Sequence, residues 1–489
     1  MGFTDATGTT TRAYDADNRM TNETKNGATI SYTYDGTGQI GLLSSETDQS
    51  GRVISYSYTP RNAISQVTDP AGATTYSYDG DGHVIGETLP NGCTVTNSYN
   101  SDGELTSVIN KSSGGTVLSS FAYTYNADEI RTGVTEADGS AVSYSFDSMN
   151  ELTQEVRTGT NPYSESFSYD AMGNRISETL NGNLITYGYD SDDELLSAGN
   201  NGYTYDADGD RTSETVNGVT TAFGYDYDNQ LVSITTGTSV VGYAYDAIGR
   251  RVSRTAGGVT TFSLYDGGRV ILEAQGGTYT GTYTYGVSLI RRNGEFFQYD
   301  GLGSARTFTN ASGVVIAAAT YDGYGNTVAT SGSTGSPYQF GATSGYRNDG
   351  DAEIMQVGAR YYDPATGSFL TRDADLSQLA YVYCGDDPID GVDPSGHNEL
   401  TTMPSLPIGW HWGWLPFPGI PLPIKNSIPK LGIGWILKST PMNWQKGTSV
   451  TITPTYGTGG IIISAPISSV WPFTLYSVTF EIQGKINIR

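Results

Sequence analysis

Hydrophobic and polar residues alternate over short stretches of this chain, and most stretches end at an acidic turn. In the segment ATISYTYD, Ile30, Tyr32 and Tyr34 alternate with small polar residues. A period of two places these apolar side chains on one face of an extended strand. Asn-Gly steps such as Asn26-Gly27 recur between the stretches, and this dipeptide favours the two-residue turns of β-hairpins. The pattern therefore predicts a series of antiparallel hairpins.

The hairpin pattern repeats through about the first half of the chain, with a period close to twenty residues. Most units read aromatic-x-aromatic-Asp-x-x-Gly, and a fixed period of this kind marks a repeat architecture. We expect one hairpin per unit, with the Asp capping the turn that follows it. Type I′ turns are expected at Asn26-Gly27, Asn91-Gly92, Asn181-Gly182 and Asn217-Gly218. The second aromatic residues of the thirteen units are Tyr14, Tyr34, Tyr58, Tyr78, Tyr99, Tyr125, Phe146, Tyr169, Tyr189, Tyr205, Tyr225, Tyr245 and Tyr265.

So many consecutive hairpins make one long antiparallel sheet, and a sheet of that length has to curl or coil. The composition agrees, because the chain has 63 Gly and 36 Tyr but only 16% charged residues among its 489. Glycine and tyrosine are typical of tight turns and strands, whereas long surface helices need more charge. The predicted fold class is all-β.

The composition changes abruptly near residue 398. Residues 1–397 carry 20 Lys and Arg against 49 Asp and Glu, whereas residues 398–489 carry 6 against 2 and hold all six Trp. Such an acidic body argues against nucleic-acid binding by the repeats. Residues 448–489 alternate and are rich in β-branched residues, so they predict three or four strands. We therefore expect a separate, small β-rich C-terminal domain.

The units resemble the YD repeats of the Rhs family, which includes bacterial polymorphic toxins and insecticidal toxin components. The segment GARYYDPATGSFLTRDADLSQLAYVYCGDDPIDGVDPSGH, residues 358–397, resembles the repeat-associated core of that family. The resemblance implies a hollow β-shell around a toxin polypeptide; thirteen units are fewer than a full shell needs, which leaves its closure open. The expected domains are a repeat shell at 1–298, a core at 299–397 and a variable toxin-like domain at 398–489.

The resemblance also implies self-cleavage by an aspartic-type mechanism. Matched to the family motif, Asp373 and Asp393 are the catalytic pair, Arg360 is the supporting cation, and the cut falls between His397 and Asn398. His397 departs from the pattern, since Leu is usual there. The plainer alternative is that Asp-Pro and Pro-x-Gly steps only form turns.

On that plainer alternative, Arg360 would simply pair with Asp363 or Asp373. If the aspartates are catalytic, Asp386 and Asp387 are expected to add negative potential beside them.

Other polar residues are expected to be structural. Asp206, Asp208 and Asp210 resemble the start of a calcium loop, but Gly at the sixth position and Glu at the twelfth are missing. They are expected to be repeat-turn residues. His83 is expected to be solvated and Cys384 to be a buried small residue. No metal and no other cofactor is expected.

Two functions of different classes follow. The first is a secreted or surface-exposed bacterial toxin, whose own C-terminal domain is the cargo and whose further partner is a cognate immunity protein. The alternative is a non-enzymatic bacterial surface protein whose repeats bind carbohydrate and whose tail is a structural cap. No signal peptide is visible, and the repeats start at once, so an N-terminally truncated chain is expected.

The activity of the tail stays open at this level. With two acidic residues, no Cys and one His, the tail argues against a metal nuclease, a zinc deaminase or a Cys-based enzyme. A metal-free ribonuclease using His411 and Glu481, or basic residues with Tyr456, is one alternative. Membrane contact through GGIIISAPISSVWPF is another, and a small β-domain with a Trp core is the plain one.

Overall fold

The computed structural model describes residues 2–35, 41–375, 377–397, 400–401, 435–442 and 475–482. The chain divides into two compact units, Met1–Trp414 and Leu415–Arg489. In the described part of the second unit, β39 (Trp435–Met442) pairs antiparallel with β40 (Leu475–Ile482). The other strands expected in the tail, His411, Tyr456 and the segment GGIIISAPISSVWPF lie outside the described residues, and so does the side chain of Glu481. Among the described residues, no helix is long and apolar enough to cross a membrane.

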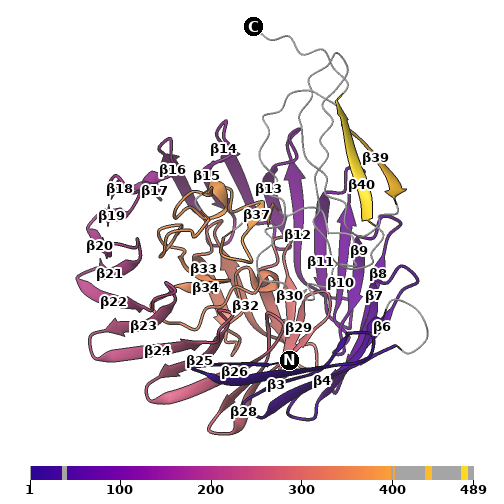
Figure 1. Ribbon diagram of the computed structural model, residues 1–489. Coiled ribbons are helices and arrows are strands. Elements are labelled where there is room, and N and C mark those ends of the chain that lie inside the picture. Colours follow the sequence, from indigo (N-terminus) through magenta and orange to yellow (C-terminus); the bar gives the residue numbers. More distant parts are fainter. Residues whose placement is uncertain are drawn as a thin grey trace. The chain divides into compact units, whose positions relative to one another are not determined.

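The first unit contains one antiparallel sheet of 33 strands, in which each strand pairs with the next along the chain (Figure 1). No pairing between β1 and β33 closes the sheet among the residues described. The all-β prediction is confirmed. The strands are β1 (Gly2–Asp5), β2 (Gly8–Tyr14), β3 (Met20–Lys25), β4 (Ala28–Tyr34), β5 (Leu43–Thr47), β6 (Val53–Tyr58), β7 (Ile64–Asp69), β8 (Gly72–Tyr78), β9 (Val84–Thr88), β10 (Thr94–Tyr99), β11 (Leu105–Lys111), β12 (Val117–Tyr125), β13 (Arg131–Glu136), β14 (Ala141–Phe146), β15 (Leu152–Thr158), β16 (Tyr163–Tyr169), β17 (Arg175–Leu180), β18 (Asn183–Tyr189), β19 (Leu195–Ala198), β20 (Asn201–Tyr205), β21 (Arg211–Val216), β22 (Val219–Tyr225), β23 (Leu231–Thr236), β24 (Ser239–Tyr245), β25 (Arg251–Ala256), β26 (Val259–Asp266), β27 (Arg269–Gln275), β28 (Thr278–Tyr285), β29 (Leu289–Arg292), β30 (Glu295–Tyr299), β31 (Ala305–Thr309), β32 (Val315–Tyr321) and β33 (Thr327–Gly332).

In the units that have two aromatic residues, the two differ in burial and in hydrogen bonding. The first, such as Tyr76 in β8, is buried on the inner face of the sheet. The second is half-buried, and its hydroxyl donates to a backbone carbonyl one unit earlier, as Tyr225 does to Arg211 O at 3.0 Å. This bond ties every second strand to its predecessor and explains why Tyr rather than Phe occupies the position. The same bond is made by Tyr34, Tyr58, Tyr78, Tyr125, Tyr169, Tyr189, Tyr245 and Tyr265.

The turns follow the expectation with one exception. In most units the Asp carboxylate accepts backbone N–H groups two and four residues on, as Asp226 Oδ1 does from Asp228 and Gln230 at 3.0 Å each. Asn26, Asn181 and Asn217 have the positive φ of a type I′ turn, each followed by a Gly of positive φ. Asn91 does not, and only Gly92 has positive φ there. The type I′ prediction for Asn91 is wrong because the loop has three residues and begins with Pro90. Leu89 N donates to Cys93 O at 2.8 Å and Gly92 N donates to Leu89 O at 2.9 Å, and in such a loop only the last residue needs a positive φ.

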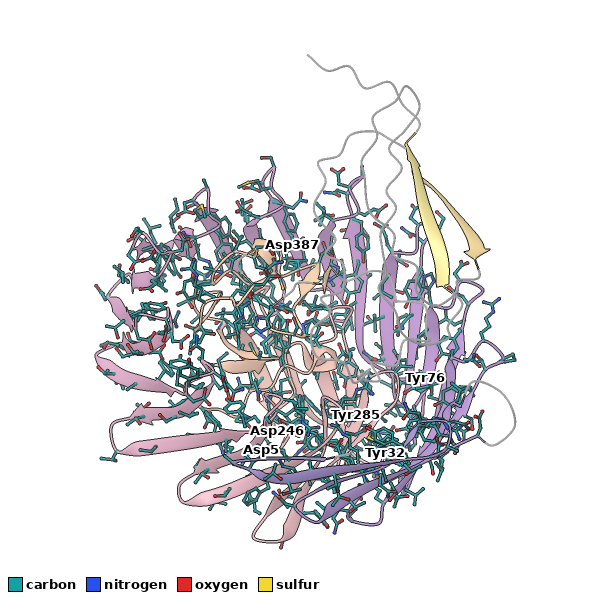
Figure 2. All side chains as sticks on the ribbon, in the orientation of Figure 1. Asp5, Tyr32, Tyr76, Asp246, Tyr285 and Asp387 are labelled. Atoms are coloured by element: carbon teal, nitrogen blue, oxygen red, sulfur yellow. The ribbon has the colours of Figure 1, made fainter. Side chains whose placement is uncertain are left out.

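The sheet folds back so that its early strands face its late ones. Tyr32 of β4 donates to Asp266 Oδ1 of β26 at 2.6 Å. Asp5 Oδ2 accepts the N–H of Ala247 at 3.0 Å, and Figure 2 shows Asp5 next to Asp246. Apolar side chains of the early and of the late strands form one cluster, in which Ile54, Ile64, Val67 and Tyr76 pack with Ile290 and Phe296. The curl expected of such a long sheet is therefore fixed by specific contacts.

A segment after the last sheet strand packs on the inner face of the sheet (Figure 1, orange). It contains η1 (Ala342–Ser344), β34 (Met355–Val357), β35 (Arg360–Asp363), β36 (Ser368–Phe369), η2 (Cys384–Asp386) and β37 (Gly391–Val392), followed by β38 (Leu400–Thr401). We call residues 333–397 the core segment. Its buried side chains Tyr346, Tyr362, Phe369 and Tyr383 pack with Leu152 and Phe167 of the sheet. Where the core segment lies, the chain itself fills the inner face.

Candidate functional site

The candidate site lies where three parts of the core segment meet. Arg360 is the first residue of β35, and Leu370, after β36, donates its N–H to Tyr361 O at 2.9 Å. Asp373 follows and is held by its own N–H, which donates to Ala380 O at 2.8 Å. Asp393 comes directly after β37. All three predicted catalytic residues are buried, with relative exposures of 5% for Arg360 and 3% for each Asp.

The Arg360 guanidinium connects the two carboxylates. Its Nη2 lies 2.7 Å from Asp373 Oδ2 and 3.8 Å from Asp393 Oδ2. The guanidinium carbon lies 3.6 Å from the centre of the Phe369 ring, which covers one face of the cation. Burial lowers the pKa of Arg360 to about 10, against the opposite effect of the two carboxylates. Arg360 therefore stays charged at neutral pH, and it pairs with Asp373 as one alternative predicted.

Asp363, the other predicted partner of Arg360, is used elsewhere. Its Oδ2 accepts from Arg211 Nη1 of the sheet at 2.9 Å. The pair anchors the core segment to β21, so this Asp-Pro step is structural.

Asp393 builds the turn that leads to the predicted cleavage position. Its Oδ1 accepts from Ser395 Oγ at 3.0 Å, from Gly396 N at 2.9 Å and from His397 N at 3.2 Å. Gly396 has φ +74°, and a Cβ there would lie 2.4 Å from Val357 O. Only glycine fits such a position. The turn predicted at Asp393-Pro394 is confirmed, and it lies directly beside the start of β35.

The residues before the predicted scissile bond are held by the same groups that were predicted to cut it. Arg360 Nε donates to Gly396 O, and Ala359 N donates to Ser395 O at 2.9 Å. The imidazole Nδ1 of His397 lies 3.0 Å from Asp373 Oδ1, which also accepts the N–H of Asp375 at 2.8 Å. Asn398, on the other side of the bond, lies outside the described residues. The structure thus brings Arg360, Asp373, Asp393 and His397 together.

Tyr346 is a site residue that sequence reasoning missed. Its hydroxyl accepts the N–H of Asp393 at 2.6 Å and lies 3.0 Å from the hydroxyl of Tyr383. Both tyrosines have 0% exposure. Tyr346 therefore fixes the backbone at Asp393. It stands in no repeat and no matched motif, so no sequence signal pointed to it.

Asp386 and Asp387, which were expected to add negative potential to the site, contact groups outside it. Asp386 is buried against the sheet, with its Oδ1 3.4 Å from the Tyr324 hydroxyl. Burial raises the pKa of Asp386 well above its ordinary value. Asp387 Oδ1 accepts the N–H of Asp390 at 3.2 Å within its own turn.

The other singled-out polar residues are structural, and one expectation was wrong. Asp206 Oδ1 accepts N–H groups of Asp208 and Asp210, as a repeat turn requires. Cys384 is buried, as predicted. His83 is not a solvated side chain. Its Nδ1 lies 2.8 Å from Asp79 Oδ2, and its ring stacks on Tyr99 at 4.6 Å.

A meander of repeat hairpins that wraps around its own core segment defines a YD-shell protein. The chain belongs to the Teneurin YD-shell family, whose model matches residues 3–155 and 93–383. The Rhs-type YD-repeat identification is thereby confirmed.

Curated relatives include two bacterial nucleases. The tRNA3(Ser)-specific nuclease WapA of Bacillus spizizenii is 28% identical over 394 residues, covering 78% of this chain and 11% of the relative. The tRNA nuclease WapA of Bacillus subtilis is 30% identical over 131 residues, covering 24% of this chain and 6% of the relative. The chain thus spans about a tenth or less of the length of these relatives.

Among solved structures, the Photorhabdus luminescens Tc holotoxin pore aligns with a TM-score of 0.63 at 13% identity. The alignment covers 81% of this chain and 26% of the toxin chain. At that identity the likeness concerns the fold alone. The chain therefore carries a YD shell of the type found in polymorphic toxins.

Proposed function

We propose that this chain is the shell part of a secreted or surface-exposed bacterial toxin, and that it cuts itself after His397 to free its C-terminal residues as the effector. The observation that carries the proposal is the grip on residues 395–397. Three predicted catalytic residues contact this short segment. Arg360 donates to Gly396 O, Asp393 accepts the N–H groups of Gly396 and His397, and Asp373 lies next to the His397 ring. A turn with a purely structural role needs only the Asp393 contacts. The nuclease names of the WapA relatives support an effector role for the tail.

The chemistry is amide hydrolysis with water as the second reactant. Two carboxyl groups held near one another tend to share one proton, which supplies one base and one acid. Asp373, which pairs with the Arg360 guanidinium and accepts the N–H of Asp375, is the proposed base and takes a proton from water. The water oxygen attacks the carbonyl carbon of His397, and Asp393 gives its proton to the carbonyl oxygen.

Collapse of the tetrahedral intermediate breaks the C–N bond. Asp373 gives the proton that it took from water to the nitrogen of Asn398, which leaves as an amine, and Asp393 takes back a proton from one hydroxyl group of the intermediate. His397 keeps the new carboxyl group, so one water is consumed per cut. Arg360 positions both carboxylates and holds Gly396 O, which fixes the peptide next to the bond.

The direct test is the state of the full chain on a denaturing gel. Wild type is expected as two fragments, the smaller beginning at Asn398, whereas Asp373→Asn and Asp393→Asn are each expected as one intact chain. Asp363→Asn is the matched control, because it also removes a buried, Arg-paired Asp before a proline but lies outside the site. Cleavage in either site variant, or none in wild type, contradicts the proposal. An uncut wild type would favour the alternative of a non-enzymatic surface protein.

The released tail is the proposed cargo, and a cognate immunity protein its proposed partner. Expression of residues 398–489 alone is expected to arrest bacterial growth, and the product of an adjacent gene is expected to restore it. Unchanged growth would remove the toxin part of the proposal while leaving self-cleavage intact.

A further inference from the structure

Residues 206–210, the turn between β20 and β21, contact the stretch of the core segment that leads to one of the proposed catalytic aspartates. Arg211 N, at the start of β21, donates to Leu370 O at 2.8 Å. Directly beside this bond, Asp210 pairs antiparallel with Thr371, two residues before that aspartate. Asp210 and Thr371 are buried. A turn that closes a repeat hairpin therefore also pairs with backbone of the proposed cleavage site.

The neighbouring stretch of the core segment is bonded to the same turn. Asp373 N donates to Ala380 O at 2.8 Å, and the next residue, Tyr381, donates its hydroxyl to Gly209 O at 2.8 Å. The ring of Tyr381 lies edge-on to that of Tyr205, with centroids 5.7 Å apart. Tyr381 is buried. The turn thus acts on the backbone around Asp373 both directly and through Tyr381.

Gly209 is the point at which the turn and Tyr381 come close together. Gly209 has φ +83°, and a Cβ there would lie 2.7 Å from the Tyr381 hydroxyl oxygen. Gly82, at the same position of another repeat turn, has φ +98° and no atom within 4 Å of the place of a Cβ. Both turns need glycine for their backbone. At Gly209 the missing side chain also leaves room for a hydroxyl group of the core segment.

We propose that the turn at residues 206–210 positions Asp373 for the cut, with Tyr381 as the positioning residue between them, so that the chain is cut only once the core segment has docked on β21. The inference rests on the proposed function. Asp373 has to meet Asp393, which follows β37 in a different part of the core segment. The turn belongs to the 33-stranded sheet and holds the Asp373 stretch at one place on it. A misplacement of about 1 Å lowers a rate of this kind by about a hundredfold.

The first test removes one buried hydroxyl group at a time from full-length chains made in a cell-free system. Tyr381→Phe removes the bond to Gly209 O, and Tyr362→Phe, the matched control, removes a bond of the same 2.8 Å length from a buried core tyrosine to Tyr324 O. Both changes should lower the urea unfolding midpoint alike, measured in chains that also carry Asp393→Asn and stay uncut. Only Tyr381→Phe is expected to slow cleavage, by about tenfold, as followed by gel. Equal cleavage rates in the two variants would assign Tyr381 to folding alone and overturn the proposal.

The glycines give a second matched pair. Gly209→Ala displaces the Tyr381 hydroxyl group and is expected to slow cleavage at least as much as Tyr381→Phe. Gly82→Ala introduces the same kind of backbone strain without touching a neighbour and is expected to cut at the wild-type rate. Equal rates for these two chains would also contradict a positioning role of the turn.

A disulfide separates positioning from folding. Asp210 and Thr371 form a pair whose hydrogen bond lies beside it, between Arg211 and Leu370, and such pairs have Cα atoms about 4.5 Å apart. A disulfide spans this distance. Asp210→Cys and Thr371→Cys, added to Tyr381→Phe, are expected to restore most of the wild-type cleavage rate once the new disulfide is verified by mass, and to lose it again on reduction.

The outcomes keep this inference apart from the proposed function. A verified disulfide that does not restore cleavage overturns the positioning role and leaves the proposed self-cleavage in place. No cleavage in any of the chains, wild type included, overturns the proposed function itself.

Discussion

The turns Asp79–His83 and Asp393–His397 share the sequence pattern Asp-x-x-Gly-His but differ in the contacts that hold them. In the repeat turn, every polar group of the pattern is satisfied inside the turn or by its neighbour Tyr99. In the core turn, Asp393 Oδ1 again accepts the N–H groups three and four residues on, those of Gly396 and His397. Arg360, Tyr346 and Asp373, however, contact the core turn from other loops, and Asp393 N donates to the Tyr346 hydroxyl where Asp79 N donates to His83 O. The repeats are therefore stabilised locally and many times over, whereas the core turn depends on a few buried contacts that exist once. Substitutions at equivalent positions should cost more in the core than in the repeats.

The largest difference is expected for the arginines. Arg360→Met leaves two buried carboxylates without their cation, which should lower the free energy of unfolding by about 3–5 kcal/mol and abolish cleavage. Arg19→Met removes a solvent-screened ion pair with Asp15 in a repeat turn, Nε to Oδ2 2.7 Å, and should lower the free energy of unfolding far less. Urea unfolding followed by circular dichroism measures both. Equal losses of unfolding free energy in the two variants would show that Arg360 matters no more to stability than an arginine of a repeat turn.

The turn glycines give the next difference. Gly82 has φ +98°, and no atom lies within 4 Å of the place that an alanine methyl group would take, so Gly82→Ala should cost only the left-handed backbone strain, about 1–2 kcal/mol. Gly396→Ala adds a backbone contact of 2.4 Å to Val357 O, which forces the turn away from β35. We expect a larger loss of stability and loss of cleavage, measured by the same unfolding curves and a gel. A Gly396→Ala chain that cuts normally would show that the grip on residues 395–397 is not needed.

A smaller difference is expected for two tyrosine hydroxyls. Tyr225→Phe removes a half-buried bond to a carbonyl and should cost about 0.5–1.5 kcal/mol. Tyr346→Phe leaves the buried N–H of Asp393 without its acceptor, which costs about 1–3 kcal/mol. Cleavage should also slow in Tyr346→Phe, because Asp393 loses a positioning contact. Unchanged cleavage with lowered stability would assign Tyr346 to folding alone.

A further prediction concerns pH and the buried carboxyls of the repeat sheet. Burial first, then the charge of Asp322, raises the pKa of Glu165 to about 9. The folded state therefore keeps a proton that the unfolded state loses above about pH 4.5. Stability should fall as pH rises from about 5 towards 9, and Glu165→Gln should flatten that fall. Unfolding midpoints at several pH values test this, and an unchanged slope in the variant would contradict it.

Much of the repeat region could be predicted from the sequence because its contacts are local. The alternation seen at Tyr32 and Tyr34 was sufficient to predict the strands and their buried faces. The Asp after each unit was sufficient to predict the turns. The return of the sheet on itself could not be predicted, since Tyr32 and Asp266 are 234 residues apart and belong to different units. The prediction for Asn91 was wrong for a local reason, because Pro90 directly before it belongs to a three-residue loop and not to a two-residue turn.

The site was predictable only in part. Arg360, Asp373 and Asp393 followed from a resemblance, and the structure brings them together. The contact of His397 with Asp373 had no sequence signal, because a turn of the same pattern at Asp79 keeps its His for itself. The burial of Asp386 is a property of packing, and its pattern of neighbours in sequence gave no sign of it.

The central claim is that the core turn cuts the chain after His397, and the intact mass of freshly made full-length protein tests it most directly. The account predicts two polypeptides whose masses add up to the whole chain plus one water, the smaller with Asn398 at its N-terminus. It also predicts a single uncut mass for Asp393→Asn made in the same way. One uncut mass for wild type, or a cut elsewhere in the chain, would contradict it.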